Sequence, residues 1–283
     1  MYAITGASGQ LGRLAVQALQ RRVGADRVVA LARTPARAAD LGVEVRRFDY
    51  ADPASLPAAL QGVERLLLVS SSEIGQRTAQ HRNVINAARE AGVGFIAYTS
   101  LLHADSSPLD LAEEHRQTEA ALRESGIAHA VLRNGWYFEN HTQSLPGALA
   151  AGSLAGCAGD GRISWASRQD YAEAAAAVLA ADMPQAGVFE LGGDHGHTLS
   201  ELAAELSRQS GTPVAYQDLP ASAYADLLAS FGLPPALAGA IAGWDAAARD
   251  GALLARDATL SRLIGRPTTT LAEAVRAALP DPA

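Results

Sequence analysis

The chain has 283 residues, of which 48% are hydrophobic, so it can bury the core of one large domain or of two coupled domains. Its 23 basic and 30 acidic residues give a net charge of −7, which argues against nucleic acid or an anionic membrane as the main partner. All of the basic residues are arginine, which excludes any mechanism that needs a lysine.

The expected compartment follows from cysteine content and from the lack of long apolar segments. The single cysteine, Cys157, cannot form an internal disulfide. An expected strand from residue 2 leaves no room for a signal peptide. The alanine-rich runs at 172–181 and 236–248 are shorter than the ~18–20 residues of a membrane span. We therefore expect a cytoplasmic protein with no membrane partner.

The chain opens with a motif typical of phosphate binding. A short apolar run at 2–5 meets Gly6, Gly9 and Gly12, and an amphipathic segment at 10–21 follows. Glycine lets a pyrophosphate approach the backbone, and the N–H groups at the start of the helix favour its charge. The spacing differs from G-x-G-x-x-G but retains its mechanics. A tight turn without a ligand is the alternative.

Taken in order, apolar runs alternate with amphipathic segments, the pattern of βαβ units. Strands are expected near 2–5, 27–32, 43–48, 65–70, 94–99 and 128–133. Helices are expected near 10–21, 36–41, 54–61, 75–91 and 111–125. The predicted fold is α/β, a Rossmann-type doubly wound parallel sheet with a smaller C-terminal substrate lobe.

The end of the second strand indicates which dinucleotide is bound. Arg33 stands about 20 residues past the glycine turn, where an acidic residue would bind the 2′-hydroxyl of NAD and an arginine would accept a 2′-phosphate. No acidic residue occupies 28–39, so NADPH is favoured. A solvated arginine at the end of a strand is the alternative. Asp49, after the third strand, is placed to meet the adenine amino group.

Polar residues follow three further strands, at the edge where ligands bind in open α/β sheets. The fourth strand leads into Ser70-Ser71-Ser72-Glu73, and the fifth ends at Thr99 and Ser100. The sixth ends in an aromatic and amide cluster at 134–140, which suits a nicotinamide ring and a flat acceptor. Helix capping by the serines and anchoring of a loop by the aromatic residues are the alternatives.

The second half gives weaker signals. A glycine-rich stretch at 141–168 is followed by a helix at 169–181, a strand at 187–191, and paired small helices within 219–249. This part could close over the cofactor as a lid or form a homodimer surface. We expect an NADP-binding domain at 1–133 and a substrate lobe at 134–283, partly interleaved with the sheet. His195 and His197 lack a third ligand, so no metal site is expected.

Several motifs together resemble the NmrA-like branch of atypical short-chain dehydrogenases. They are the glycine turn, Arg33, and the segments at 70–73, 80–88, 95–105 and 132–137. The resemblance implies an NADPH-binding protein that reduces quinones without a flavin. The cofactor contacts expected from the residues and the resemblance are Gly6, Ala7, Ser8, Gly9, Gln10, Leu11, Arg33, Ser71, Thr99, Tyr137, Phe138, Glu139, Asn140, His141, Thr142 and Arg168.

One departure from ordinary short-chain dehydrogenases bears on the chemistry. Their Tyr-x-x-x-Lys pair is replaced by His115 and Glu119 on the helix after the fifth strand. A quinone tolerates this loss, because its reduced anion is delocalised and can take a proton from water. The candidate catalytic residues are His115, Asn134 and Tyr137. A redox sensor that binds NADP(H) with little turnover is the alternative function.

Overall fold

The computed structural model describes residues 1–279 and contains a central parallel sheet of seven strands. The strand order is β3-β2-β1-β4-β5-β6-β8, and every neighbouring pair is parallel. The strands are β1 (Tyr2–Ile4), β2 (Val28–Ala32), β3 (Glu44–Arg47), β4 (Arg65–Leu68), β5 (Phe95–Leu101), β6 (Ala128–Asn134) and β8 (Gly187–Leu191). The predicted Rossmann-type sheet is confirmed.

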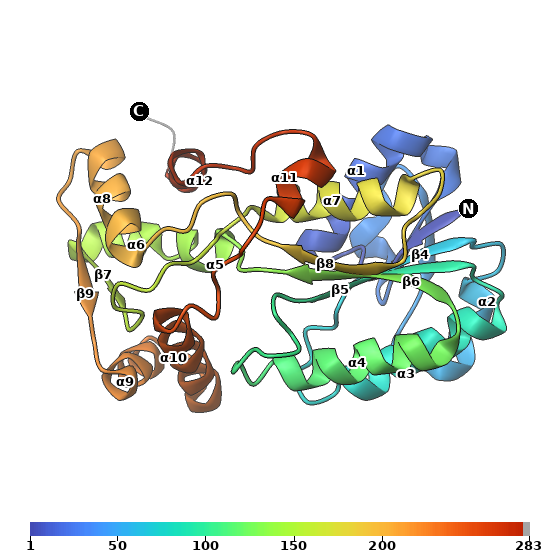
Figure 1. The fold of residues 1–283 in the computed structure, drawn as a ribbon, viewed down its shortest axis with the longest axis horizontal. Coiled ribbons are helices and arrows are strands. Elements are labelled where there is room, and N and C mark those ends of the chain that lie inside the picture. Colours follow the sequence, from blue (N-terminus) through green and yellow to red (C-terminus); the bar gives the residue numbers. More distant parts are fainter. Residues whose placement is uncertain (280–283) are drawn as a thin grey trace.

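Helices cover both faces of the sheet (Figure 1). One face is covered by α1 (Gln10–Val23), α7 (Arg168–Ala180) and α11 (Thr259–Ile264). The other is covered by α2 (Leu56–Ala59), α3 (Arg77–Glu90) and α4 (Ala112–Ser125). Each layer buries its own apolar cluster against the sheet, because the strands are apolar on both sides.

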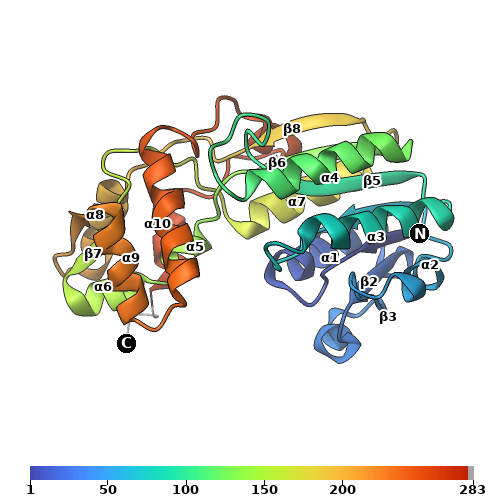
Figure 2. The ribbon, with the colours of Figure 1, turned by 90° about the horizontal axis from the view of Figure 1, so that it is seen from below.

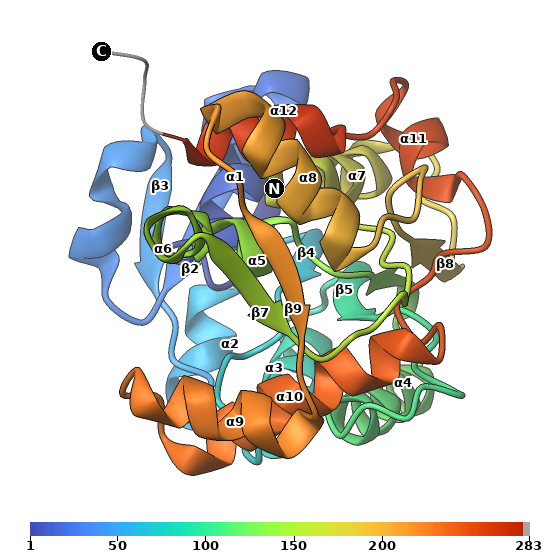
Figure 3. The same cartoon turned by 90° about the vertical axis from the view of Figure 1, so that its left-hand side faces the viewer.

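A second group of elements forms a small lobe beside the carboxyl ends of the strands (Figures 2 and 3). Its parallel pair is β7 (Ser153–Gly156) and β9 (Ala215–Asp218). Its helices are α6 (Leu145–Ala151), α8 (Leu199–Ser210), α9 (Ala221–Ser230), α10 (Pro235–Arg249) and α12 (Leu271–Ala278). A third apolar cluster joins this lobe to the loops that follow β5 and β6.

The second half of the chain is divided between the sheet and the small lobe. Helix α7, strand β8 and helix α11 return to the sheet, as Figure 1 shows, so residues 134–279 do not form one separate body. The rest of the predicted lobe, 280–283, lies outside the described residues. Short helix α5 (Glu139–Thr142) links the two parts.

Local differences from the expected elements have simple causes. The segments expected as helices near 36–41 and 54–61 are largely 3₁₀ turns, η2 (Pro35–Leu41) and η3 (Pro53–Ser55), the latter followed by the single turn α2. Each begins with proline, which suits the first turn of a helix, and neither is long enough to continue. A third such turn is η1 (Ala25–Arg27). Strands β7 and β9 were not predicted, because β7 lies within the glycine-rich stretch and β9 is polar and largely exposed.

The lone cysteine lies in the core of the small lobe. Cys157 is 1% exposed, and its Sγ donates to the carbonyl oxygen of Ala242 at 3.1 Å. Burial, followed by the nearby Asp245 carboxylate, raises the pKa of the Cys157 thiol to about 11. The thiol is therefore protonated near neutral pH. Within residues 1–279, no helix has both the length and the apolar character needed to cross a membrane.

Candidate functional site

The glycine turn lies where the strand order reverses between β1 and β4, the position at which open α/β sheets bind ligands. Gly6 has a φ of 61°, which favours glycine. A Cβ on Gly12 would lie 2.2 Å from the carbonyl oxygen of Gly6. The close packing of α1 against the turn therefore requires glycine at position 12.

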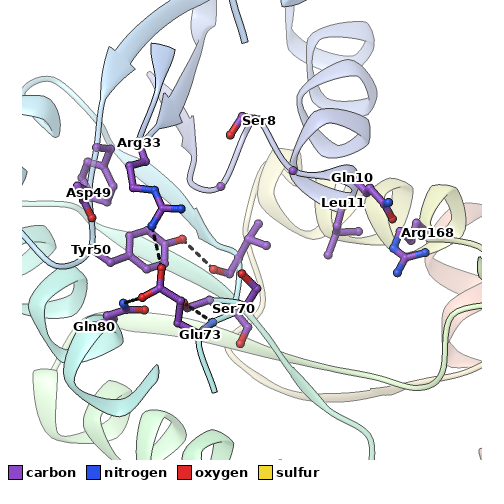
Figure 4. Close-up of a pocket in the computed structure, with 17 residues that line it drawn as sticks. Ser8, Gln10, Leu11, Arg33, Asp49, Tyr50, Ser70, Glu73, Gln80 and Arg168 are labelled. Atoms are coloured by element: carbon purple, nitrogen blue, oxygen red, sulfur yellow. Dashed lines mark hydrogen bonds and ion pairs between the residues drawn. The ribbon is translucent and has the colours of Figure 1, made fainter. Parts of the chain in front are cut away.

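A cavity of about 390 Å³ lies against this turn, and we call it the glycine-turn cavity (Figure 4). It runs from the start of α1 past Arg33 to the loop after β4. Its walls are Gly6, Ser8, Gly9, Gln10, Leu11, Gly12, Arg33, Phe48, Asp49, Tyr50, Val69, Ser70, Ser71, Ser72, Glu73, Gln80 and Arg168. Eight residues predicted from the sequence to contact the cofactor thus line one cavity: Gly6, Ser8, Gly9, Gln10, Leu11, Arg33, Ser71 and Arg168.

Arg33 lies at one end of this cavity and is held by an acidic residue. Its Nη1 donates to Oε1 of Glu73 at 2.7 Å, and the Arg33 side chain is 66% exposed. Gln80 donates to the other carboxylate oxygen of Glu73 at 2.7 Å. Hydrogen bonds from Gln80 and then Arg33 lower the pKa of Glu73. The guanidinium is accessible to an anion, which would compete with Glu73.

A second cavity of about 360 Å³ continues from the first, and we call it the aromatic cleft. The two share Leu11, Val69, Ser70, Ser71, Ser72 and Arg168. The remaining walls of the cleft are Arg77, Thr99, Ser100, Leu101, Leu111, His115, Asn134, Gly135, Trp136, Tyr137, Asn140 and Trp244. A long ligand in the glycine-turn cavity can therefore extend one end into the aromatic cleft.

Aromatic and amide groups from β6 and the loop after it shape one side of this cleft. The guanidinium carbon of Arg168 lies 4.6 Å from the ring centre of Tyr137, and its Nη2 donates to Asn140 at 3.0 Å. Trp136 packs edge-on against Trp244 of the small lobe, with ring centres 5.7 Å apart. The cleft therefore presents flat apolar surfaces with a few polar groups, as small-molecule sites do.

The loop after β4 is held by buried groups on neighbouring elements. The backbone N–H of Ser70 donates to Oγ1 of Thr99 at 2.8 Å, and that of Ser71 donates to Nε2 of His81 at 2.9 Å. Burial, with a smaller effect of the Arg77 charge, lowers the pKa of His81 to about 3. His81 is therefore neutral near pH 7, as an acceptor of this bond must be.

His115 stands where ordinary short-chain dehydrogenases carry their tyrosine. It is 5% exposed, lines the aromatic cleft, and has Nδ1 2.7 Å from the hydroxyl of Tyr98. Burial, followed by the charges of Arg77 and His81, lowers the pKa of His115 to about 3. The imidazole ring of His115 is therefore neutral near pH 7. It can form hydrogen bonds but is not a general acid.

Glu119, at the lysine position of that motif, is engaged in the protein interior. It is 2% exposed and accepts hydrogen bonds from Arg133 at 2.8 and 3.0 Å and from the Ser100 hydroxyl at 2.6 Å. Arg133 also pairs with Asp105 and Glu190. These contacts, led by Glu119, raise the pKa of Arg133 further. Glu119 therefore holds β5, β6 and α4 together and does not line the cleft.

Three other residues predicted to contact the cofactor pack beneath the glycine turn or in the core of the small lobe. Ala7 is fully buried under the turn, with its N–H donating to Leu31 at 3.1 Å. Phe138 stacks on Trp165 with ring centres 5.8 Å apart, and His141 accepts from the Trp165 indole at 3.2 Å. The side chains of Phe138 and His141 thus pack in the small-lobe core rather than in the cleft, because Trp165 draws the loop inward. Their predicted cofactor contacts remain predictions.

Glu139 and Thr142 lie beside a separate shallow cavity that also touches Gln10 and Arg168. Oε1 of Glu139 accepts from the backbone N–H of Arg168 at 3.0 Å, and its Oε2 lies 3.4 Å from the Arg168 guanidinium. These contacts fix the position of Arg168. Cofactor contact by Glu139 and Thr142 also remains a prediction.

Sequence reasoning missed several residues at the site, including Tyr50, Gln80, Arg77 and Trp244. Tyr50 donates to the Val69 carbonyl at 2.8 Å and also bonds the hydroxyl of Thr5, tying β1 to β4. Gln80 holds Glu73, and Arg77 and Trp244 line the aromatic cleft. Tyr50 follows the flagged Asp49 and could have been found. Arg77 and Trp244 lie in helices whose patterns carry no sign of a site.

The residues at the glycine-turn cavity fit a dinucleotide. Helix α1 begins after Gly9 with no side-chain cap and no acidic residue in its first turn, which leaves its first N–H groups for an anion. A Cβ on Gly9 would lie 3.3 Å from the Gly6 carbonyl oxygen, which is a tight contact. Glycine avoids this contact, and without a side chain it leaves the backbone of the turn open to the cavity. Arg33 supplies a cation at the distance along the chain expected for a 2′-phosphate.

Comparisons with known proteins agree with this arrangement. The family model described as NAD(P)H-binding matches residues 6–182. The chain is 55% identical to Quinone oxidoreductase 2 of Escherichia coli over 97% of both chains. It is 30% identical to an NmrA-like family domain-containing oxidoreductase of Aspergillus flavus, over 75% of this chain and 72% of that protein.

Solved structures give the same result. The NADPH complex of the Escherichia coli NADPH-dependent quinone oxidoreductase superposes with a TM-score of 0.95, covering 98% of this chain and 99% of that one, at 55% identity. The Citrobacter triphenylmethane reductase complexed with NADP(H) superposes with a TM-score of 0.95 at 35% identity, covering 99% and 100% of the two chains. The chain belongs to the NAD(P)H-binding family of NmrA-like oxidoreductases.

Proposed function

We propose that this protein is an NADPH-dependent oxidoreductase that reduces quinones by direct hydride transfer without a flavin. The observation that carries the proposal is the continuity of the glycine-turn cavity with the aromatic cleft at the carboxyl edge of the sheet. The 55% identity to Quinone oxidoreductase 2 over nearly the whole chain supports the same function.

The residues have distinct proposed roles. The glycine turn, from Gly6 to Leu11, holds the pyrophosphate, and Arg33 holds the 2′-phosphate. Bound NADPH supplies the hydride. Thr99, Asn134 and Asn140 orient the nicotinamide end, while Tyr137 and Trp136 present flat surfaces to the acceptor.

The absence of the tyrosine and lysine pair suits a quinone. His115 is neutral, and Glu119 is bound to Arg133 in the interior, so neither delivers an acidic proton to a strongly basic alkoxide. A reduced quinone carries a delocalised charge and takes its proton from water. Proximity and orientation in the cleft then supply most of the rate enhancement.

The division of labour between the two parts of the molecule is also proposed. Residues 1–133 hold the adenosine and pyrophosphate end of the cofactor, and the small lobe covers the acceptor through Trp244, which reaches the cleft from α10. The free thiol of Cys157 fits a reducing compartment such as the cytoplasm.

A steady-state assay tests the function. Purified protein is mixed with NADPH and either benzoquinone or menadione, and the loss of NADPH absorbance is followed. We expect turnover that saturates with both substrates and is faster with NADPH than with NADH. Tight NADPH binding with no turnover on either quinone would overturn the proposal and favour a redox sensor.

A further inference from the structure

Three residues that line the aromatic cleft each carry a buried polar atom with no hydrogen-bond partner among residues 1–279. These atoms are Nη1 of Arg77, Oγ of Ser70 and Oδ1 of Asn134. Buried polar atoms are nearly always paired, because leaving them unpaired is costly. Their gathering in one cleft points to a polar ligand that completes their bonds.

Arg77 is the charged member of this group. It is the first residue of α3, and its Nε donates to the carbonyl oxygen of Ser71 at 2.7 Å, which anchors the guanidinium at the rim of the loop. A guanidinium remains protonated at every relevant pH. Its charge contributes, after burial, to the lowered pKa of His115, which also lines the cleft. The cation therefore acts on groups inside the cleft.

The other arginine of the cleft is already engaged. Arg168 contacts Glu139 at 3.4 Å and Asn140 at 3.0 Å, and it covers the ring of Tyr137. No carboxylate lines the cleft among residues 1–279. The charge of Arg77 is therefore not offset by an acid within the cleft, and its Nη1 has no hydrogen-bond partner among residues 1–279, so an anionic or strongly polar oxygen bound there would complete its bonding.

We propose that Arg77 is a catalytic residue that stabilises the negative charge formed on the acceptor oxygen, with the Ser70 hydroxyl as a second donor. This inference rests on the proposed function and extends it. The quinone gains a hydride from NADPH, and NADPH becomes NADP⁺. The product is a hydroquinone anion whose negative charge is on a quinone oxygen. Arg77 and Ser70 hold this oxyanion until a proton from water completes the hydroquinone.

Fixed donors aimed at a developing charge are effective because the site does not have to reorganise during the reaction. Neutral His115 and internally paired Glu119 leave this task to another group. Arg77 stabilises an oxyanion without giving up a proton. It also favours acceptors whose reduced form is an oxyanion over acceptors whose reduced form is neutral.

The test compares Arg77→Gln and Arg77→Lys with Arg82→Gln, which removes an exposed arginine from the same helix. For each variant, kcat and KM are measured with menadione, and the dissociation constant of NADPH is measured separately by titration. The second readout uses 4-nitrophenol as a probe for the product, in the presence of NADP⁺. The ionised probe has its own absorbance band, so its bound pKa is read directly and without turnover.

We expect Arg77→Gln to lower kcat with menadione by about tenfold or more, because one donor to the oxyanion is lost, while NADPH binds within about twofold of wild type. Wild-type protein should lower the pKa of bound 4-nitrophenol by about one unit, as a close positive charge does, and Arg77→Gln should abolish this shift. Arg77→Lys should retain part of both effects. Arg82→Gln should match wild type.

Two results would overturn the inference. One is unchanged kcat and an unchanged pKa of 4-nitrophenol in Arg77→Gln. The other is a large loss of NADPH affinity with an unchanged pKa of the probe, which would make Arg77 a cofactor ligand. Failure of the proposed function is distinguishable, because wild-type protein would then reduce no quinone while the probe still reports the charge of Arg77.

Discussion

Nη1 of Arg33 lies 2.7 Å from Oε1 of Glu73, so the arginine proposed to hold the 2′-phosphate is already paired with a carboxylate. Forty residues separate the two in sequence, and both line the glycine-turn cavity. A 2′-phosphate bound to Arg33 would compete with Glu73 for the guanidinium and would lie near the negative charge of Glu73. We therefore expect Glu73 to oppose the binding of NADPH.

Replacing Glu73 with glutamine should strengthen NADPH binding. We expect the dissociation constant of NADPH to fall about twofold to fivefold, the range typical of an exposed ion pair, because Arg33 is released and a repulsive charge is lost. The dissociation constant of NADH, which lacks the 2′-phosphate, should change little. Titration of both cofactors by quenching of protein fluorescence measures this, and weaker NADPH binding would contradict the role given to Glu73.

Removing Arg33 should have the opposite effect on cofactor choice. Arg33→Ala loses a charge-assisted bond to phosphate, so we expect the preference for NADPH over NADH to fall by about tenfold or more. Comparing kcat/KM for the two cofactors at saturating menadione measures the change. Arg22→Ala, at an exposed position in the last turn of α1, is the matched control and should keep the preference. An unchanged preference in Arg33→Ala would show that the phosphate is held elsewhere.

Gly12→Ala should disrupt the start of α1. The added Cβ would lie 2.2 Å from the Gly6 carbonyl oxygen and 3.0 Å from the Cα of Ala7, and both are backbone atoms that cannot rotate away. We expect a loss of about 1–3 kcal/mol in the free energy of unfolding and weaker NADPH binding. Gly239→Ala, in the open on α10, should instead raise stability by up to about 1 kcal/mol. Urea denaturation of both variants tests the contrast.

The Glu119 and Arg133 pair should matter for folding rather than for the chemical step. Glu119→Gln removes the most deeply buried of the three carboxylates that pair with the guanidinium of Arg133, so we expect a loss of about 3 kcal/mol in the free energy of unfolding. Glu113→Gln removes a carboxylate that pairs with Arg116 on the exposed face of the same helix and should have little effect. Equal urea midpoints for the two variants would contradict this assignment.

Acidification should destabilise the protein through its buried histidines. The pKa of His81 is lowered to about 3 in the folded state, against an ordinary value of 6.5. Stability is complete above the unfolded value and is lost as the pH falls from 6.5 towards 3, because only the unfolded state binds the proton. The free energy of unfolding should fall by up to about 1.4 kcal/mol per pH unit for this histidine.

The measurement is urea denaturation at several pH values between 7 and 4.5. His81→Gln should reduce the pH dependence to the part that His115 causes, while lowering stability at pH 7, since the N–H of Ser71 loses its acceptor. His195→Gln changes an exposed histidine and should keep the wild-type slope. A wild-type slope in His81→Gln would mean that other groups cause the acid sensitivity.

The sequence predicted the sheet and the phosphate turn because those features are local. The periodicity of apolar residues and the spacing of the glycines place the turn at Gly6 to Gly12. The end of β2 places Arg33 at the same carboxyl edge of the sheet. Contacts between distant residues carry no such pattern. The Arg33 to Glu73 pair, the burial of Glu119 against Arg133 and the entry of Trp244 into the cleft all depend on how separate elements pack.

The turn that follows β6 shows the same limit in a single segment. Its aromatic and amide composition indicated a site, and Asn134, Tyr137 and Asn140 do line the cleft. Phe138 and His141 instead face Trp165, about 25 residues further along the chain. Composition marks such a segment as important, but only the packing partner decides which side chains face the ligand.

The burial of Cys157 also matters for the resistance of the protein to its own quinone substrate. Quinones are alkylating agents as well as oxidants, because thiolates and amines add to their rings. This chain has no lysine, and its single thiol is 1% exposed with a pKa raised to about 11. Since the thiolate is the reactive form, the cysteine is protected both by burial and by protonation. The protein therefore offers few strongly nucleophilic groups that a quinone could modify.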